Sequence, residues 1–266
     1  MIMKSVKLVY FSPTKTTKAA CTGILNGIAP IKVQEIDITT PKAREEMLKA
    51  TAEDLLVIGV PVYMGRVPVL ITGWLSTMQL EKTPTVCVVV YGNRVYEDAL
   101  IELTDIVRSC GGIPVAGGAF IGEHSFSTPE TPTAVGRPDL RDLSVAEEFG
   151  EKIREKLMAA GPSTPPADVQ VPGEHPYRGE STLWDVDFIA VNDQCTQCGI
   201  CAEGCPAGAI DPSDSSIIDI TLCITCCACI RNCPRQAREM KPGLVRDASL
   251  RLYTLYPEPK RPEYYL

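Results

Sequence analysis

The sequence has no apolar run long enough to cross a membrane. Its longest strongly apolar stretches, residues 55–62 and 86–91, are far shorter than the ~20 residues that a membrane-spanning helix needs. The start of the chain also lacks the basic segment and the apolar segment of a secretory signal peptide. We therefore expect no membrane span, a cytoplasmic location and reduced cysteines.

Basic charge and histidine are scarce as well. The 266 residues include 26 Lys and Arg against 33 Asp and Glu, a net charge of -7, and only 2 His. A nucleic-acid surface needs clustered Lys and Arg, so this composition argues against a nucleic-acid partner. The chain also lacks a G-x-G-x-x-G turn between a strand and a helix, and a resident nicotinamide cofactor is therefore not predicted.

Cysteine, in contrast, is abundant and regularly spaced. Near the C-terminus, the pattern C-x2-C-x2-C-x3-C-P occurs twice, 28 residues apart. This spacing is typical of proteins that bind two 4Fe-4S clusters, in which three close thiolates hold one cluster and the fourth, before the proline, holds the other. The predicted ligand sets are therefore crossed: Cys195, Cys198, Cys201 and Cys233 for one cluster, and Cys205, Cys223, Cys226 and Cys229 for the other.

Other interpretations of these cysteines remain open. C-x2-C pairs also form zinc sites, although zinc needs two pairs rather than two quadruplets that each end in Cys-Pro. Cys227 falls at the position of Gly199 in the first half, and we interpret it as a small side chain in a tight loop rather than as a ninth ligand. Elsewhere we expect buried, inert thiols at Cys21, Cys87 and Cys110. The apolar residues expected to shield the clusters are Ile200, Ile210, Ile224 and Ile230.

The region before the cysteines alternates β-branched runs with amphipathic stretches. Five strands are predicted, at residues 6–11, 31–38, 54–62, 85–92 and 113–121, with helical patterns between most of them. This alternation predicts a doubly wound α/β fold with a five-stranded parallel sheet covered on both faces. A last helix is predicted from Ser144 to Ala160, with Ser144 and Glu147 as its capping box and Gly161-Pro162 as its stop.

The predicted domain organisation follows the cysteines and the changes in composition. Residues 1–160 would form the α/β domain, and residues 161–190, which begin rich in Pro, Gly and Ser, would form a linker. Residues 191–240 would form a small α+β domain around the two clusters. The tail, residues 241–266, has no clear period, and we expect it to wrap over other surfaces.

A hydroxyl-rich turn follows the first predicted strand. It contains Ser12, Thr14, Lys15, Thr16 and Thr17, and it leads into a helix. Backbone N–H groups and hydroxyls at a helix N-terminus bind phosphate, whereas the simpler alternative is that Ser12 or Thr14 only caps the helix. The turn follows the first strand, at the edge of a doubly wound sheet where ligands bind, and this position favours a phosphate site.

The turn resembles the phosphate loop of flavodoxins, Ser/Thr-x-Thr-Gly-x-Thr, which holds the phosphate of FMN. Ser12, Thr14 and Thr17 match its hydroxyl positions, and Lys15 stands where glycine is usual. By this resemblance, two further loops would flank the flavin ring: Pro61, Val62, Tyr63, Met64 and Gly65 after the third strand, and Tyr91, Gly92, Asn93 and Arg94 after the fourth.

Together with the cysteine repeat, these loops make the chain similar to the flavodoxin-ferredoxin fusion family. The resemblance implies a flavodoxin-like first domain that binds FMN and a ferredoxin-like second domain with two 4Fe-4S clusters. His124 follows the fifth predicted strand, where it would be either a proton donor beside the flavin or an ordinary loop histidine. The loop at residues 126–139 would be a lid or a connector.

Three functions are compatible with these patterns. The leading hypothesis is electron transfer, in which the chain relays electrons between an outside redox protein, the two clusters and FMN. An alternative is an enzyme, a flavin-dependent reductase of a small organic acceptor that the clusters supply with electrons. The other alternative is a redox-responsive binding module with an empty flavodoxin-like domain, for which Lys15 in place of glycine is the best support.

Overall fold

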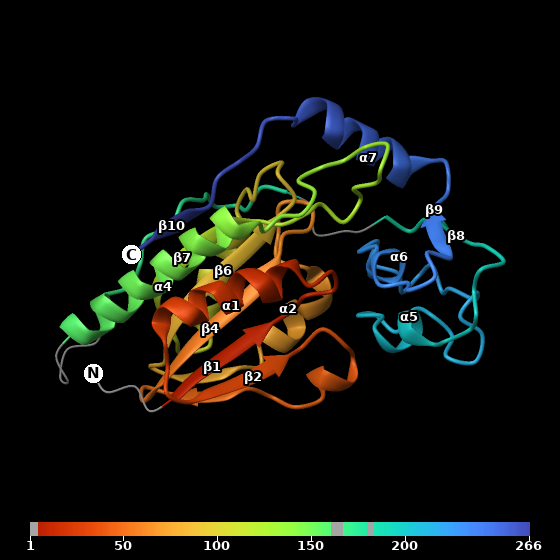
Figure 1. The fold of residues 1–266 in the computed structure, drawn as a ribbon. Coiled ribbons are helices and arrows are strands. Elements are labelled where there is room, and N and C mark those ends of the chain that lie inside the picture. The colour runs from red at the N-terminus through yellow and green to blue at the C-terminus, as the bar shows by residue number, and fades with distance from the viewer. Residues whose placement is uncertain (1–4, 161–166, 180–183) are drawn as a thin grey trace.

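A six-stranded sheet forms the centre of the larger domain (Figure 1). The computed structural model describes residues 5–160, 167–179 and 184–266. The five predicted strands are confirmed, and they pair in parallel in the order β7-β6-β4-β1-β2, which is the flavodoxin-like strand order. Their bounds are β1 Ser5–Tyr10, β2 Val33–Asp37, β4 Asp54–Pro61, β6 Pro84–Tyr91 and β7 Ile113–Ile121.

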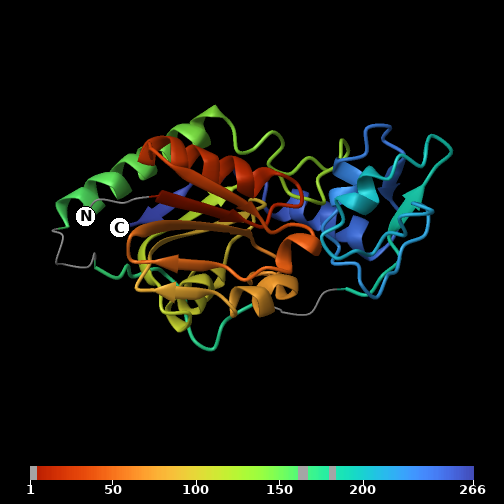
Figure 2. The ribbon, with the colours of Figure 1, turned by 90° about the horizontal axis from the view of Figure 1, so that it is seen from below.

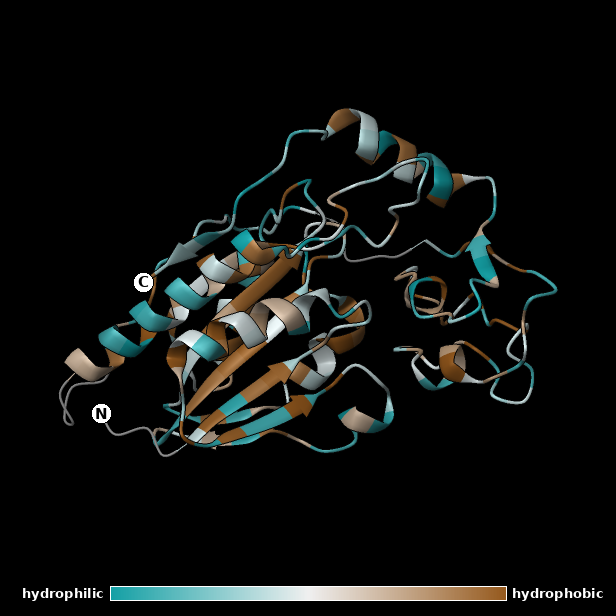
Figure 3. Ribbon diagram, viewed as in Figure 1, coloured by the Kyte–Doolittle hydropathy of each residue, from teal (hydrophilic) through white to brown (hydrophobic). Residues whose placement is uncertain are grey.

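The central strands are continuous aliphatic runs because both of their faces are covered. All eight residues of β6 are buried, whereas the edge strand β2 is mostly exposed. One face of the sheet is covered by α1 (Thr16–Ile28) and α4 (Leu140–Ala159), and the other by α2 (Val69–Leu75) and α3 (Ala99–Ser109), as Figure 2 shows. Figure 3 shows hydrophobic central strands between helices whose outer faces are largely hydrophilic.

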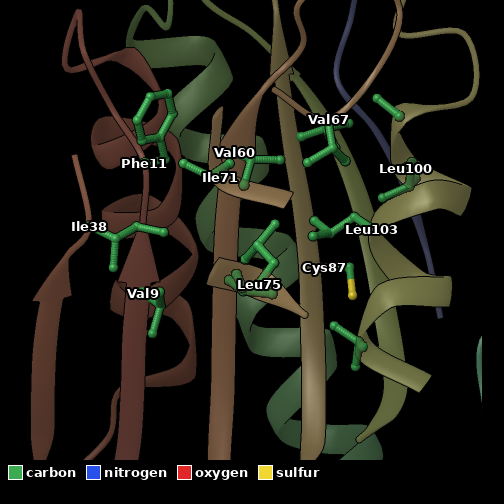
Figure 4. Packing of buried hydrophobic residues seen from close by; sticks show 14 of the residues in the cluster. Val9, Phe11, Ile38, Val60, Val67, Ile71, Leu75, Cys87, Leu100 and Leu103 are labelled. Carbon is green, nitrogen blue, oxygen red and sulfur yellow. The ribbon is translucent and has the colours of Figure 1, made fainter. Parts of the chain in front are cut away.

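The core on the α2 and α3 face joins side chains from both helices to those of the strands. Figure 4 shows Val9, Val60 and Cys87 from the strands together with Ile71 from α2 and Leu103 from α3. On the opposite face, α1 and α4 touch through glycine. A Cβ added to Gly27 would lie 1.9 Å from the carbonyl oxygen of Glu147, so a larger residue would force the two helices apart.

The last helix of this domain begins earlier than the sequence predicts. It starts at Leu140, not at Ser144, because Asp139 provides the N-cap. The Asp139 carboxylate accepts hydrogen bonds from the backbone N–H groups of Arg141 and Asp142 at 2.8 and 3.0 Å, and the Asp142 carboxylate accepts one from the Asp139 N–H at 2.9 Å. The predicted capping box of Ser144 and Glu147 is therefore wrong. The predicted stop at Gly161-Pro162 lies outside the described residues.

Several short elements are not predicted by the sequence. They are the 3-10 helix η1 (Lys42–Arg44) and a two-stranded parallel sheet of β3 (Lys49–Thr51) and β5 (Gln79–Glu81). The tail wraps over the larger domain as expected, but it contains regular structure that its sequence does not suggest. Helix α7 (Leu244–Leu255) crosses beside the carboxyl ends of the strands, and β10 (Glu263–Tyr265) pairs antiparallel with β7 as the sixth strand (Figure 1).

The cysteine region forms a small α+β unit at the carboxyl ends of the parallel strands (Figures 1 and 2). Strands β8 (Ile189–Val191) and β9 (Arg238–Met240) pair antiparallel, and α5 (Ile200–Glu203) and α6 (Ala228–Arg231) are single turns. Between the two halves of the cysteine repeat, an isolated antiparallel bridge joins Ile210 and Ile218. Within the described residues, every helix is too short or too polar to cross a membrane.

Candidate cofactor sites

Two cavities in the cysteine region bring the predicted ligands together. The first, here called the outer cavity, is lined by Cys195, Cys198, Cys201 and Cys233. The second, the inner cavity, is lined by Cys205, Cys223, Cys226, Cys227 and Cys229. Each cavity thus takes three spaced cysteines from one half and the Cys-Pro cysteine from the other. This arrangement has the connectivity of the crossed ligand sets.

The two halves hold their Cys-Pro thiols in the same way. The backbone N–H of Ala209 donates to the Cys205 Sγ at 3.3 Å, and that of Ala237 donates to the Cys233 Sγ at 3.3 Å. Such donors favour a thiolate. Burial opposes it and raises the pKa of Cys226, and it raises that of Cys229 to about 12. Metal binding must therefore displace protons from these thiols.

Among the described residues, no three His, Cys, Asp or Glu side chains are placed to hold a single metal ion. The cysteines surround two cavities instead, and apolar residues complete the walls. Ile210, Ile218 and Ile224 line the inner cavity and Ile200 lines the outer one, whereas the predicted Ile230 lines neither.

Cys227 occupies the same backbone position as Gly199. Its φ is 56° and that of Gly199 is 76°, and both residues precede a short helix in the left-handed conformation. The Cys227 side chain packs against Phe188 and Val245, although it also lines the inner cavity. Its predicted role as a non-ligand stays a prediction.

A third pocket, the edge pocket, lies at the carboxyl edge of the sheet. Its walls include two residues of the predicted phosphate turn, Thr14 and Thr16. The predicted ring-flanking loops supply Pro61, Val62, Tyr63, Met64, Tyr91 and Gly92. Residues 122–126 form another part of the wall, with His124 among them.

The phosphate turn keeps its geometry without glycine. Lys15 has a φ of 69°, the left-handed conformation that favours glycine, and its N–H donates to the Ser12 carbonyl oxygen at 3.1 Å. The Ser12 hydroxyl accepts a hydrogen bond from the Lys18 N–H at 3.0 Å, so it serves the start of α1. The hydroxyl of Thr17 is buried and has no hydrogen-bond partner among the described residues. An unpaired buried hydroxyl in this turn fits a ligand with acceptor oxygens.

Backbone hydrogen bonds and an ion pair hold the loop after β4 in place. Tyr63 and Arg66 exchange two 3.0 Å backbone hydrogen bonds around Met64 and Gly65, which both have positive φ. The Arg66 guanidinium binds the Glu102 carboxylate through two hydrogen bonds of 2.8 and 2.7 Å. Gly65 faces an adjoining cavity rather than the edge pocket.

Only some residues of the loop after β6 line the edge pocket, and the others bind elsewhere in the described structure. Tyr91 and Gly92 line the edge pocket, but Asn93 binds the tail: its amide donates to the carbonyl oxygens of Tyr256 and Glu258 at 2.9 and 3.0 Å. Arg94 pairs with Glu97 and faces the adjoining cavity. Asn93 and Arg94 thus do not line the edge pocket, because the tail and Glu97 take up their hydrogen bonds.

His124 lies against Gly92 at the mouth of this pocket. A Cβ added to Gly92 would lie 2.2 Å from the His124 Cδ2, so only glycine permits this contact. The Nδ1 of His124 accepts a 3.0 Å hydrogen bond from the Phe126 N–H, which leaves its proton on Nε2. Burial and the charges of Arg231 and Arg94 lower the pKa of His124 to about 4. The ring is therefore neutral at pH 7 and can donate a hydrogen bond from Nε2.

The sequence did not predict that the cysteine region would close the edge pocket. Ile224 and Thr225 line it, and Trp184 lines it from the segment before β8. Ile224 also lines the inner cavity, so one residue belongs to both sites. No sequence pattern pairs Ile224 with Tyr63, because their place in one pocket depends on how the two regions dock.

Comparisons with known proteins agree with the two parts of the chain. Residues 194–238 match a family model described as a 4Fe-4S dicluster domain. An uncharacterized protein of Methanothermobacter thermautotrophicus is 34% identical over 153 residues, which are 54% of this chain and 30% of that protein. The chain thus spans about a third of the length of this curated relative.

Two solved structures are similar to the larger domain. One is a flavodoxin from the domain Archaea, with 19% identity and a TM-score of 0.39 over 58% of this chain and 99% of that one. The other is a flavodoxin of Streptococcus pneumonia TIGR4, with 15% identity and a TM-score of 0.40 over 57% and 99%. The flavodoxin-like assignment itself rests on the strand order. The chain therefore joins a domain of flavodoxin-like topology to a segment of the 4Fe-4S dicluster type.

Proposed function

We propose that this protein transfers electrons between two 4Fe-4S clusters and an FMN. Residues 191–240 would hold the clusters in the outer and inner cavities, and residues 1–160 would hold the FMN in the edge pocket. The observation that supports this most is the wall shared by the edge pocket and the inner cavity. Ile224 lines both, and the sequence places it between Cys223 and Cys226.

Tyr63 strengthens this connection. It lines the edge pocket, and its hydroxyl is close enough to Cys226 and Cys227 for their charges to contribute to the raised pKa of the tyrosine. Burial is the larger cause. When bound, the clusters carry single electrons and FMN accepts one or two. The residues of the shared wall would keep the two kinds of cofactor close and exclude water from between them.

The phosphate turn would hold the FMN phosphate. The N-terminus of α1 offers backbone N–H groups and the positive end of its dipole, and Thr14, Thr16 and Thr17 offer hydroxyls. Lys15 adds a positive charge to the same turn. Tyr63, Tyr91 and Trp184 line the rest of the pocket with aromatic rings suited to a planar ligand.

The test is anaerobic reconstitution of the full chain, followed by an absorption spectrum and counts of flavin and iron. The proposal expects about one FMN and about eight irons per chain, the count for two 4Fe-4S clusters. Eight irons without flavin, even after FMN is added, would refute the relay and favour a binding module. Zinc in place of iron would refute it as well.

A second candidate function is reduction of a small organic acceptor. A larger cavity adjoins the edge pocket, shares His124 and Trp184 with it, and reaches Arg94, Arg251 and Leu252. Its lining combines apolar and aromatic side chains with Arg251 and the Arg94–Glu97 ion pair, which suits a planar organic acceptor. His124, neutral and protonated on Nε2, could donate a hydrogen bond to such a molecule.

This second function is tested by screening acceptors against the fully reduced protein. Quinones, nitro compounds and enoates would be compared with an oxidised ferredoxin as reoxidants. A reductase requires an organic acceptor that reacts faster than the ferredoxin. Leu252→Trp would fill part of the cavity, so it should slow the organic acceptor and leave the ferredoxin reaction unchanged.

A further inference from the structure

Arg238, the first residue of β9, is a buried cation that forms no ion pair with a carboxylate of the described residues. The residue is only 4% exposed. Its Nη2 donates to the carbonyl oxygen of Ser215, and its Nη1 is buried without a hydrogen-bond partner among the described residues. None of the ion pairs in the described part of the chain includes Arg238.

Such an arrangement is costly unless an anion is supplied. Burial of an unpaired charge is strongly unfavourable, and a guanidinium cannot lose its proton to avoid it. One neutral carbonyl, that of Ser215, satisfies only part of its hydrogen-bonding capacity. The position therefore requires a negative charge from another source.

The groups beside Arg238 that can become anions are cysteine thiols. Arg238 lines the outer cavity together with Cys195, Cys198, Cys201 and Cys233, and it does not line the inner one. The buried guanidinium thus forms part of the outer wall.

The two halves of the internal repeat differ at this position, with a cation in the second half and an apolar residue in the first. Arg238 follows Cys233 by five residues, and Ile210 follows Cys205 by five. Ile210 lines the inner cavity with an apolar side chain, whereas Arg238 lines the outer cavity with a charged one. Two halves with the same cysteine spacing thus place different charges beside their cavities.

We propose that Arg238 is a built-in counter-cation that raises the reduction potential of the outer cluster relative to the inner one. Reduction adds one negative charge to a cluster, and a fixed positive charge in a poorly solvated wall favours the reduced form. The apolar Ile210 gives the inner cluster no such charge. The inference rests on the proposed function only in requiring that both clusters are present.

The experiment compares four variants of the full chain: Arg238→Met and Arg238→Gln, which remove the charge, Arg238→Lys, which keeps it, and Arg235→Met as the matched control. Arg235 also lines the outer cavity but is exposed, so solvent screens its charge. Iron and flavin are counted first. The potentials of both clusters are then measured by redox titration followed by electron paramagnetic resonance. The outer signal is identified as the one that Cys198→Ser alters.

The two neutral variants should lower the equilibrium constant for reduction of the outer cluster at least tenfold, which is about 59 mV for one electron. Arg238→Lys should stay within threefold of the wild type, and so should Arg235→Met. A shift in Arg238→Met no larger than in Arg235→Met would overturn the inference, as would an equal shift in Arg238→Met and Arg238→Lys.

Loss of iron from the Arg238 variants also tests the inference. If both neutral variants lose iron while Arg238→Lys retains it, the site requires the charge and the inference stands. If Arg238→Lys loses iron too, the shape of the arginine matters rather than its charge, and the inference fails. A wild-type protein with iron but no flavin would refute the electron relay and leave this comparison intact.

Discussion

The side-chain amide of Asn232 donates a 3.1 Å hydrogen bond to the carbonyl oxygen of Pro13. Asn232 precedes the ligand candidate Cys233, and Pro13 belongs to the phosphate turn. A second bond of this kind joins the Arg44 Nη2 to the Pro206 carbonyl oxygen at 2.7 Å. A residue next to each Cys-Pro cysteine thus forms a hydrogen bond with the larger domain.

Asn232→Ala should loosen this docking. Loss of one partly buried hydrogen bond costs about 1 kcal/mol, so amide hydrogen exchange at residues 12–16 and 228–233 should become about fivefold faster. Asn192→Ala is the matched control, because the Asn192 side chain binds only the nearby Gln194 N–H. Equal effects of the two variants on these amides would contradict a docking role for Asn232.

Cys205→Ser should disturb the cluster of the inner cavity rather than that of its sequence neighbours. The inner cavity joins Cys205 to Cys223, Cys226 and Cys229, while Cys201 lies in the outer one. Electron paramagnetic resonance of the reduced protein should therefore show a changed inner signal and an intact outer one. Cys227→Ala is the control and should leave both signals and the iron count unchanged. An altered outer signal in Cys205→Ser would disprove the crossed sets.

Thr17→Val should stabilise the flavin-free protein and weaken its binding of FMN. The Thr17 hydroxyl is buried and unpaired, so its removal should raise the free energy of unfolding by about 1 kcal/mol. Loss of a hydrogen bond to phosphate should raise the Kd for FMN about tenfold. Thr83→Val provides the comparison, because the Thr83 hydroxyl is also buried and unpaired among the described residues, but Thr83 precedes β6 and does not belong to the phosphate turn. It should stabilise the protein similarly without any effect on the Kd.

His124 should make the protein less stable as the pH falls below neutrality. Its folded-state pKa is lowered to about 4. Between roughly pH 6.5 and pH 4, His124 is therefore protonated in the unfolded chain but neutral in the folded protein. The stabilisation is thus present above pH 6.5 and lost through that window. In urea unfolding, the free energy of unfolding of the wild type should fall between pH 7.5 and pH 4.5 by on the order of 2 kcal/mol more than that of His124→Asn.

The matched control is His175→Asn, which replaces the other histidine of the chain. The His175 side chain is exposed, and its Nε2 lies 2.8 Å from the Asp105 carboxylate. The acid-dependent loss that His124→Asn removes should persist in His175→Asn. A parallel pH profile for wild type and His124→Asn would show that His124 does not titrate in this window.

Asp98 should hold the segment before the cysteine region against α3. Its fully buried carboxylate accepts hydrogen bonds from the Glu174 N–H at 3.1 Å and from the Arg178 Nε and Nη2 at 3.0 and 2.8 Å. These bonds lower the pKa of Asp98 to about 2, chiefly through the Arg178 side chain. Its contribution to stability is present above about pH 4 and lost as the pH falls toward 2.

Asp98→Asn should therefore lower the free energy of unfolding by about 2 kcal/mol at pH 7 and speed proteolysis within residues 167–179. Asp168→Asn removes a carboxylate from the same segment, but its pair with Arg108 is exposed and should cost under about 1 kcal/mol. Equal destabilisation by both variants would rule out a special role for Asp98.

Local sequence determined much of the fold. Aliphatic runs such as 54–61 and 84–91 are continuous and short, which favours buried parallel strands, and the spacing of the cysteines predicted which ones would share a cavity. The start of α4 was mispredicted because Asp139 competes with Ser144 as an N-cap, and local pattern alone does not rank the two.

Only the tertiary structure decided what surrounds each site. Asn93 is a turn residue by its sequence, yet its amide binds a tail that lies more than 160 residues further along the chain. Ile224 and Tyr63 line one pocket because the cysteine region docks on the carboxyl edge of the sheet. Arg238 becomes a buried cation because distant segments of the cysteine region fold around it. Hydrophobic periodicity and ligand spacing are local properties that a sequence displays. Docking depends on complementary surfaces formed by distant segments, and these exist only after the chain has folded.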